Sequence, residues 1–204
     1  MKIIKKISDF LFITFFLVFI PGMGIAWADF KIKTEMPING FAGFVVDSHQ
    51  NIYIVDSFYA IIQKYDRTGN FIKSFRVKDT SGKPFHLGID TRDNIIVTRQ
   101  TDRKVTVYPS SDREKSYSFY ADGTIQMKQA NTFFYTRNHE KYANLGGRFP
   151  AIWKLSGTKE KIVEQSFFLR LLSFPLMIVV ILTAVILKLM VFIVERWKKL
   201  QSGT

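Results

Sequence analysis

The residue types that most often catalyse reactions or hold metals are scattered through this chain of 204 residues. Its three histidines, His49, His86 and His139, lack the close spacing of a zinc motif. The chain has no Gly-x-Ser-x-Gly elbow, glycine-rich phosphate loop or calcium-binding Asp spacing, and it has no cysteine. We therefore predict no catalytic residue, no metal site and no cofactor.

Three aspartates, Asp47, Asp66 and Asp90, lie between short apolar segments. Asp and Asn side chains hydrogen-bond to their own backbone, and Gly supplies a positive φ angle, so these residue types are typical of turns. We interpret the three carboxylates as turn residues rather than as metal or substrate ligands.

The apolar segments recur along the chain. Two copies span 43–75 and 88–119, and a third, degraded copy with an insertion begins at Gly123. Asn51 and Asn94, which open equivalent strands, lie 43 residues apart, a spacing that is typical of propeller blades. Each copy holds four segments rich in Val, Ile, Tyr, Phe and Thr. The sequence predicts an all-β repeat domain of three four-stranded antiparallel propeller-like blades.

The first copy resembles the blades of the NHL-repeat β-propeller family. Residues 43–71 follow its pattern of a Gly-hydrophobic-Val-Asp strand, an Asn-hydrophobic-Tyr-hydrophobic-Val-Asp strand and an Ile-Gln-Lys-aromatic-Asp strand. Gln50 stands where the family usually has Gly, and Arg99 stands where the second copy should have Asp. The resemblance covers about 41–166 and implies the fold. NHL propellers bind proteins, RNA or sugars, and only some are lyases or hydrolases, so the resemblance does not fix an activity.

Three blades cannot close a ring, because closed propellers usually have about 4–8 blades. We therefore expect an open arc in which the first and third blades each lack one neighbour. Exposed sheet edges and apolar faces are association surfaces. Either a second copy completes the ring, or a different protein subunit covers the two faces, or the chain is a remnant of a larger propeller.

Residues 1–28 have the pattern of a secretory signal. Basic residues precede an apolar run over 10–20, and Ala26 and Ala28 form a small-x-small cleavage pattern before Asp29. The alternative is an uncleaved signal anchor. Both interpretations place the repeats on the extracytoplasmic side of the membrane.

Residues 167–195 are predicted to form one C-terminal transmembrane α-helix. The 17 residues of 171–187 carry no charge, and the apolar run continues after Lys188, which is long enough for the roughly 30 Å of bilayer hydrocarbon. Lys188 lies close enough to the basic end for its stem to snorkel. The short basic tail over 196–204 is expected in the cytoplasm, because basic residues flank spans on that side. The repeat domain, 29–166, is then extracytoplasmic or periplasmic, at the inner membrane.

The net charge of +12 does not form one basic block. Residues 29–167 hold 21 Lys and Arg against 15 Asp and Glu. A nucleic-acid partner requires a clustered basic face in a compartment that contains nucleic acid, and export argues against it. An exported domain without cysteine or an Asn-x-Ser/Thr acceptor fits a bacterial envelope.

The predicted binding surface is formed by the loops that join the second and third strands of each blade, at 56–60, 99–104 and 138–150. Cations beside aromatic rings suit an anionic or sugar-like ligand, although an ordinary solvated loop surface is the alternative. The candidate binding residues are Phe58, Tyr59, Arg99, Arg103, Lys104, Lys141, Tyr142, Arg148 and Phe149.

The sequence predicts a membrane-anchored extracytoplasmic interaction or scaffold module. We expect it to be a subunit of a homo-oligomer or of a larger membrane complex. The alternatives are an envelope enzyme of the propeller lyase or lactonase type, and a sensor that relays ligand binding through the helix. The identity of the protein partner and of any small-molecule ligand is not encoded in a recognisable motif.

Overall fold

The computed structural model divides the chain into two compact units. One is a β domain, Phe30–Leu169, and in the other Met1–Asp29 lies with Arg170–Thr204. The structure describes residues 6–7, 9–10, 12–13, 34–77, 85–99, 104–110, 116–120, 128–129, 134–137, 139–147, 149–171 and 173–202.

Four antiparallel strands in chain order form the first sheet. Its second strand has the sequence IYIVD and is buried at every position, as expected of a short apolar run that is packed on both faces. The strands are β1 (Phe41–Val46), β2 (Ile52–Asp56), β3 (Ile61–Tyr65) and β4 (Phe71–Arg76).

The second and third sheets are also antiparallel, with five and four strands. The second sheet has the order β8-β7-β6-β5-β9 and the third has the order β10-β11-β12-β13. The strands are β5 (Phe85–Ile89), β6 (Ile95–Arg99), β7 (Lys104–Tyr108), β8 (Tyr117–Tyr120), β9 (Lys128–Gln129), β10 (Phe134–Arg137), β11 (Glu140–Asn144), β12 (Ala151–Lys154) and β13 (Glu160–Glu164).

The strands predicted for the first two repeats are confirmed, but the third repeat is shifted by one strand. By the repeat pattern Asn131 is equivalent to Asn51 and Asn94, which predicts that the segment after it is the second strand of the third blade, whereas β10 is the first strand of the third sheet. The shift occurs because β9, from the start of the third repeat, pairs with β5 of the second sheet through Gly88 and Gln129. The chain then reverses at His139, which has a φ of 65°, so that β11 lies within 138–150, which the sequence predicts to be a loop.

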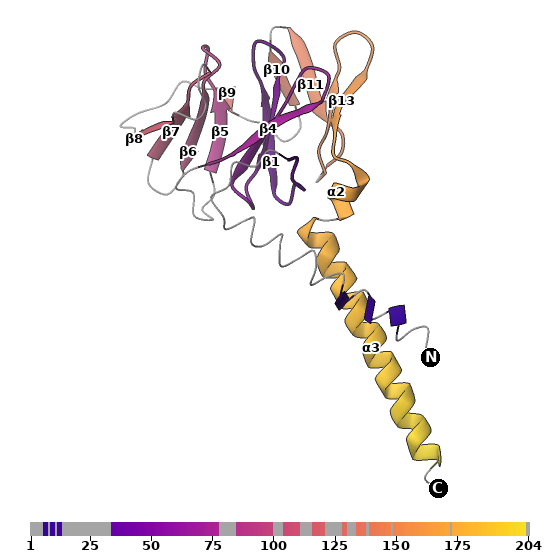
Figure 1. The fold of residues 1–204 in the computed structure, drawn as a ribbon. Coiled ribbons are helices and arrows are strands. Elements are labelled where there is room, and N and C mark those ends of the chain that lie inside the picture. The colour runs from indigo at the N-terminus through magenta and orange to yellow at the C-terminus, as the bar shows by residue number, and fades with distance from the viewer. Residues whose placement is uncertain are drawn as a thin grey trace. The chain divides into compact units, whose positions relative to one another are not determined.

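The first sheet lies between the other two, since β1 contacts both β5 and β10 (Figure 1). Phe44 packs on Tyr135 of the third sheet at 6.0 Å between ring centroids. On the other face, Phe75 packs on Tyr108 of the second sheet at 5.3 Å. One apolar core therefore includes residues from all three sheets. The predicted order of the arc is wrong: the first sheet has a neighbour on each face, because the third sheet packs against it.

The segment that precedes β1 joins the first and third sheets. Gln63 of β3 accepts a hydrogen bond from the backbone N–H of Met36 at 3.0 Å, and its Nε2 donates to the Met36 carbonyl at 2.9 Å. Gln165, which follows the third sheet, donates to the same carbonyl at 3.3 Å. Both Gln side chains are buried, so these bonds satisfy polar groups that water does not reach.

Two helices occupy the segment that was predicted as one span, α2 (Phe167–Leu171) and α3 (Phe174–Ser202). Within the part of the chain that the structure describes, no helix combines the length and the hydropathy that a membrane crossing requires. The transmembrane helix predicted over 167–195 is therefore not supported. The predicted signal cleavage position, at Ala28, lies outside the described residues.

Gly69, in the turn between β3 and β4, makes a close contact with the third sheet. It has a φ of +88°, and a Cβ atom at this position would lie 1.7 Å from the Ile162 carbonyl oxygen. Gly157 has a similar φ of +79°, but a Cβ atom there would meet nothing within 4 Å. Both glycines therefore need a left-handed backbone, but only Gly69 has no room for a side chain.

We expect Gly69→Ala to lower the free energy of unfolding more than Gly157→Ala does. The left-handed backbone alone costs about 1–2 kcal/mol for an L-residue, and overpacking at Gly69 adds about 1–3 kcal/mol. Chemical denaturation of the full chain, followed by tryptophan fluorescence, measures both variants. Equal losses in the two variants would contradict the packing of the third sheet against this turn.

Candidate functional site

Three turns at one end of the sheets share a hydrogen-bonding pattern in which an Asp carboxylate accepts bonds from the residues two and four positions later. Asp47, for example, accepts the backbone N–H groups of His49 at 3.0 Å and Asn51 at 2.8 Å. The Asn side chain returns a further bond to the same carboxylate at 2.8 Å. The pairs are Asp47 with Asn51, Asp66 with Asn70, and Asp90 with Asn94.

These bonds confirm the interpretation of the three aspartates as turn residues. Asp66 is exposed, and the hydrogen bond from the Thr68 hydroxyl, with further bonds from the turn, lowers its pKa to about 2. The residue before each Asn adopts a positive φ, and it is Gln50, Gly69 or Asp93. Because the carboxylate of Asp90 closes this turn, the side chain of Asp93 is not needed for the turn and can contact another part of the domain.

Asp93 uses that side chain to join the three sheets. Its Oδ1 accepts the backbone N–H of Ser48, from the first sheet, at 3.1 Å, and Arg137 Nη2, from the third sheet, at 2.6 Å. The Ser48 hydroxyl donates to its Oδ2. Asp93 is only 8% exposed, and the Arg137 side chain is 17% exposed, so the ion pair is shielded from water and salt.

Ser48, His49 and Asp93 lie together but do not form a catalytic relay. In a Ser-His-Asp triad the two ring nitrogens divide the work, one facing the Ser and the other facing the carboxylate. Here the same atom, His49 Nδ1, lies 3.3 Å from Ser48 Oγ and 4.0 Å from Asp93 Oδ2. The Ser48 hydroxyl donates directly to Asp93, so this group is a structural junction.

A pocket of about 460 Å³ lies beside the junction between the first and second sheets. Tyr53 forms part of its wall, donates its hydroxyl to Asp47 at 2.9 Å and lies 5.4 Å below Lys64 Nζ. The lining combines two carboxylates, Asp47 and Asp93, with the cations Lys64 and Arg92, so its formal charges balance. It is lined by Asp47, His49, Asn51, Tyr53, Lys64, Arg92, Asp93 and Ser110.

The opposite end of the first sheet carries the loop that the sequence selected as a binding surface. Asp56, fully buried at the end of β2, accepts backbone bonds from Asn39 at 2.7 Å and Phe58 at 2.7 Å, with longer ones from Gly40 and Tyr59. Burial raises the pKa of Asp56, and the amide bonds oppose that shift. This carboxylate therefore fixes the loop that presents Phe58 and Tyr59.

Phe58 and Tyr59 are the only predicted binding residues that the described structure brings into ring contact, edge to face at 5.0 Å. Phe58 is 47% exposed. In the second sheet, Arg99 ends β6 and Lys104 begins β7, and both are half-buried. Arg103 lies outside the described residues.

In the third sheet, the candidate binding residues that the structure describes do not all lie in the predicted loop. Lys141 and Tyr142 lie in strand β11 rather than in a loop, and Tyr142 is 1% exposed. Its ring belongs to the core that faces the first sheet, so burial removes it from the predicted surface. Phe149 is half-buried in the β11–β12 loop, and Arg148 lies outside the described residues.

Sequence reasoning did not single out Asp93 or Arg137. The available signal was local: Asp93 occupies the turn position that holds Gln50 and Gly69 elsewhere, where a charged residue has no local role. The partner could not be found in this way, because Arg137 lies 44 residues away in another sheet. Among the described residues, no cluster of His, Asp or Glu has the composition needed to hold a metal ion.

No family model matches the chain, and no curated protein matches it. Among solved structures it is similar to a streptogramin B lyase, with 13% identity and a TM-score of 0.37 over 67% of this chain and 45% of that one. It is also similar to selenomethionine-substituted virginiamycin B lyase from Staphylococcus aureus, with 12% identity and a TM-score of 0.32 over 60% and 41%. A third similar structure is a catalytically inactive variant of virginiamycin B lyase from Staphylococcus aureus with quinupristin. It has 11% identity and a TM-score of 0.36, over 67% of this chain and 45% of that one.

The chain spans less than half the length of these lyase structures. The similarity is distant, concerns the blade-like β-propeller arrangement alone and says nothing about activity.

We expect Asp93→Asn to destabilise the β domain, because the substitution tolerates the left-handed backbone but leaves Arg137 without its counter-charge. Removing one member of a buried ion pair typically costs about 3–5 kcal/mol. The double variant Asp93→Asn/Arg137→Met should recover part of that loss. Chemical denaturation of the full-length variants measures the coupling.

Glu164→Gln is the matched control, since it removes the more exposed pair of Glu164 with Lys161. Such surface pairs are worth about 0–1 kcal/mol. Additive effects of the Asp93 and Arg137 substitutions would show that this ion pair does not join the sheets.

Proposed function

We propose that the chain is an extracytoplasmic interaction module with NHL-like blades, attached to the inner membrane through α3. In this proposal its partner is a second copy of the chain, bound through β8. The observation that carries the proposal is the exposure of aromatic rings on this outer strand.

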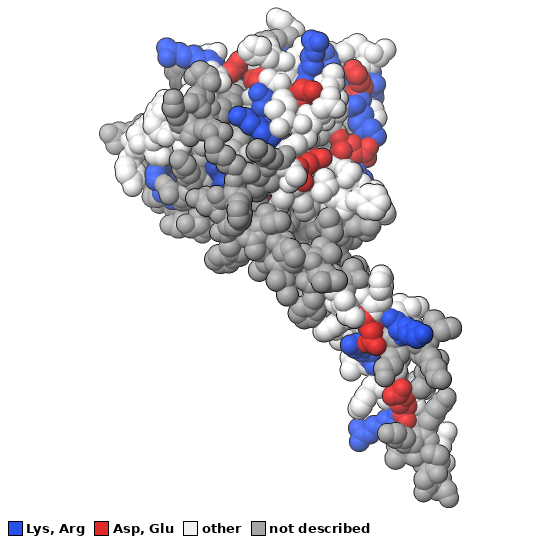
Figure 2. Space-filling model, viewed as in Figure 1, with Lys and Arg blue, Asp and Glu red and all other residues white. Residues whose placement is uncertain are grey.

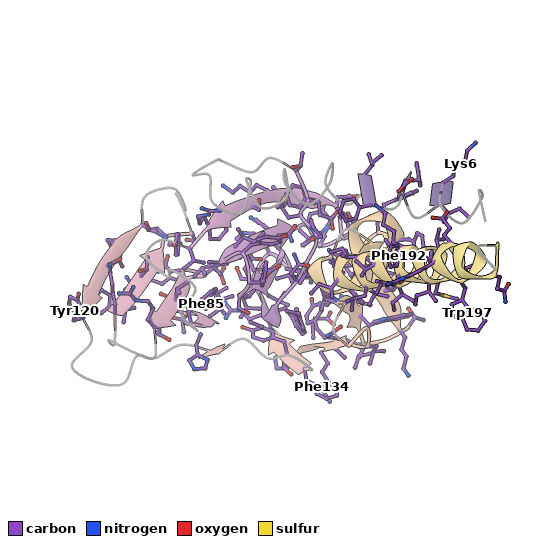
Figure 3. The ribbon with its side chains drawn as sticks, turned by 90° about the horizontal axis from the view of Figure 1, so that it is seen from below. Lys6, Phe85, Tyr120, Phe134, Phe192 and Trp197 are labelled. Carbon is purple, nitrogen blue, oxygen red and sulfur yellow. The ribbon has the colours of Figure 1, made fainter. Side chains whose placement is uncertain are left out.

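The strand β8 presents aromatic side chains on both of its faces. Tyr117, Phe119 and Tyr120 are 56%, 43% and 69% exposed, and Tyr117 stacks on Phe119 at 6.4 Å. Figure 3 shows Tyr120 at the outer margin of the second sheet. Exposed aromatic rings that are grouped on one strand are typical of a contact surface rather than of a solvated edge.

The outer edge of β8 supports pairing with another strand. Among the described residues β8 is hydrogen-bonded only to β7, so its other edge offers backbone donors and acceptors. An antiparallel pair of two β8 strands would be related by a two-fold axis, the commonest symmetry of protein oligomers. The face of the β domain in Figure 2 carries interspersed basic and acidic side chains, which do not oppose self-association by a single sign of charge.

The apolar surface of α3 supports attachment to lipid. Its large side chains are exposed in the helical unit, and Trp197, also exposed, precedes Lys198 and Lys199 at its end. Apolar helices that end in aromatic and basic residues suit a membrane interface. The exposed residues are Ile178, Val179, Leu182, Val185, Ile186, Leu189, Met190, Phe192, Ile193 and Val194.

We expect the full chain, extracted in mild detergent, to have the mass of two copies by light scattering. Phe119→Lys should yield single copies, because a charge on an edge strand opposes strand pairing. Ile72→Lys is the matched control, since Ile72 is 45% exposed on β4, the outer strand of the first sheet, and it should leave the dimer intact. A single-copy mass for the unsubstituted chain would contradict the partner proposed here.

The attachment through α3 has a separate test. Leu182→Arg combined with Ile186→Arg should lower the fraction of the chain that stays in the membrane pellet after an alkaline wash. An Arg side chain at either position would place a charge among the exposed apolar side chains and oppose their burial in lipid. Ile72→Lys should not change the distribution, and unaltered pelleting of the Arg variant would show that attachment does not depend on α3.

A further inference from the structure

Lys188 lies in the apolar part of α3, and the structure gives its ammonium group two partners near the N-terminus of the chain. Its Nζ lies 3.3 Å from Asp9 Oδ1 and 4.4 Å from the centroid of the Phe12 ring. Residues 6–7, 9–10 and 12–13 are helical where the structure describes them. Snorkelling towards the basic end is therefore not needed to explain this lysine, because the chain itself supplies a carboxylate and an aromatic face.

The pattern of burial along α3 points to the same contact. Ala184 and Val191 are 0% and 9% exposed, whereas the large side chains around them are exposed. Residues at positions i, i+4 and i+7 lie on one face of a helix, so Lys188, whose side chain is 46% exposed, lies on the same stripe as the buried Ala184 and Val191. A small residue such as Ala184 allows another helix to approach closely.

The N-terminal residues show the complementary pattern. Asp9 and Phe12 are half-buried, whereas Ile7, Phe10 and Ile13 are exposed. Residues three apart lie on the same side of a helix, so the two side chains that meet Lys188 are also the two that are shielded. Both segments belong to one compact unit (Figure 1).

We propose that the N-terminal residues that the structure describes, 6–7, 9–10 and 12–13, remain in the mature protein and pack on the stripe of α3 that carries Ala184, Lys188 and Val191. A charge among apolar residues is costly unless it is paired. Removing residues 1–28 would leave Lys188 without Asp9 and Phe12 and would uncover Ala184 and Val191. The N-terminal segment is then a structural element, in place of the cleaved signal that its sequence predicts.

The intact mass of the full chain, purified through a C-terminal tag, tests retention. The proposal requires residues 1–28 to be present, and a chain that begins at Asp29 would overturn it.

Cysteine cross-linking tests the packing, because the chain has no cysteine of its own. Phe12→Cys with Lys188→Cys should be joined by a short bifunctional maleimide and appear as one cross-linked peptide pair by mass spectrometry. Phe12→Cys with Ile186→Cys is the matched control, since Ile186 is 56% exposed and lies two residues, or about 200°, around the helix from Lys188. Equal yields from the two pairs would overturn the proposed face.

Charge reversal tests the ion pair without removing either segment. For this test the cysteines are placed at Phe12 and Val191, so that Asp9 and Lys188 stay available. Asp9→Lys should abolish the cross-link, and Asp9→Lys combined with Lys188→Asp should restore it. Persistence of the cross-link in Asp9→Lys would show that the ion pair does not hold the helices together.

Discussion

A single carboxylate, that of Asp93, accepts hydrogen bonds from residues of both other sheets. The second sheet supplies the acceptor on a left-handed turn, the first sheet supplies Ser48, and the third sheet supplies Arg137. A buried anion must be paired and hydrogen-bonded to be tolerated, so this junction sets the positions of three turns at once. Residues of two of those turns, including His49 and Asp93, line the pocket beside the junction.

Contacts that are distant in sequence extend this constraint through the rest of the β domain. The Met36 backbone bonds to Gln63 and Gln165, and Gly69 allows the Ile162 carbonyl to approach the first sheet. A small repeat domain buries its core only by stacking its units. Both faces of the first sheet are therefore packed against a neighbour, whereas β8 is an outer strand of the second sheet.

The proposed roles follow from that division between inner and outer surfaces. The inner strands are occupied by packing, and the carboxylate of Asp93 is occupied by hydrogen bonds to residues of the other two sheets. The outer strand β8 keeps its aromatic rings in solvent, and such rings gain most from association because they bury large apolar areas. In the helical unit, Lys188 is paired with Asp9, and most of the large apolar side chains of α3 are exposed.

The sequence by itself determined what local interactions decide. The strands of the first two repeats and the Asp-initiated turns follow from alternation, β-propensity and side-chain bonds that span only four residues. Tertiary structure decided the rest: that the third sheet packs on the first, that β9 joins β5, that Tyr142 is buried, and that Arg137 and Asp9 meet their partners. Each of these depends on contacts between segments tens of residues apart, whose energies no local pattern encodes.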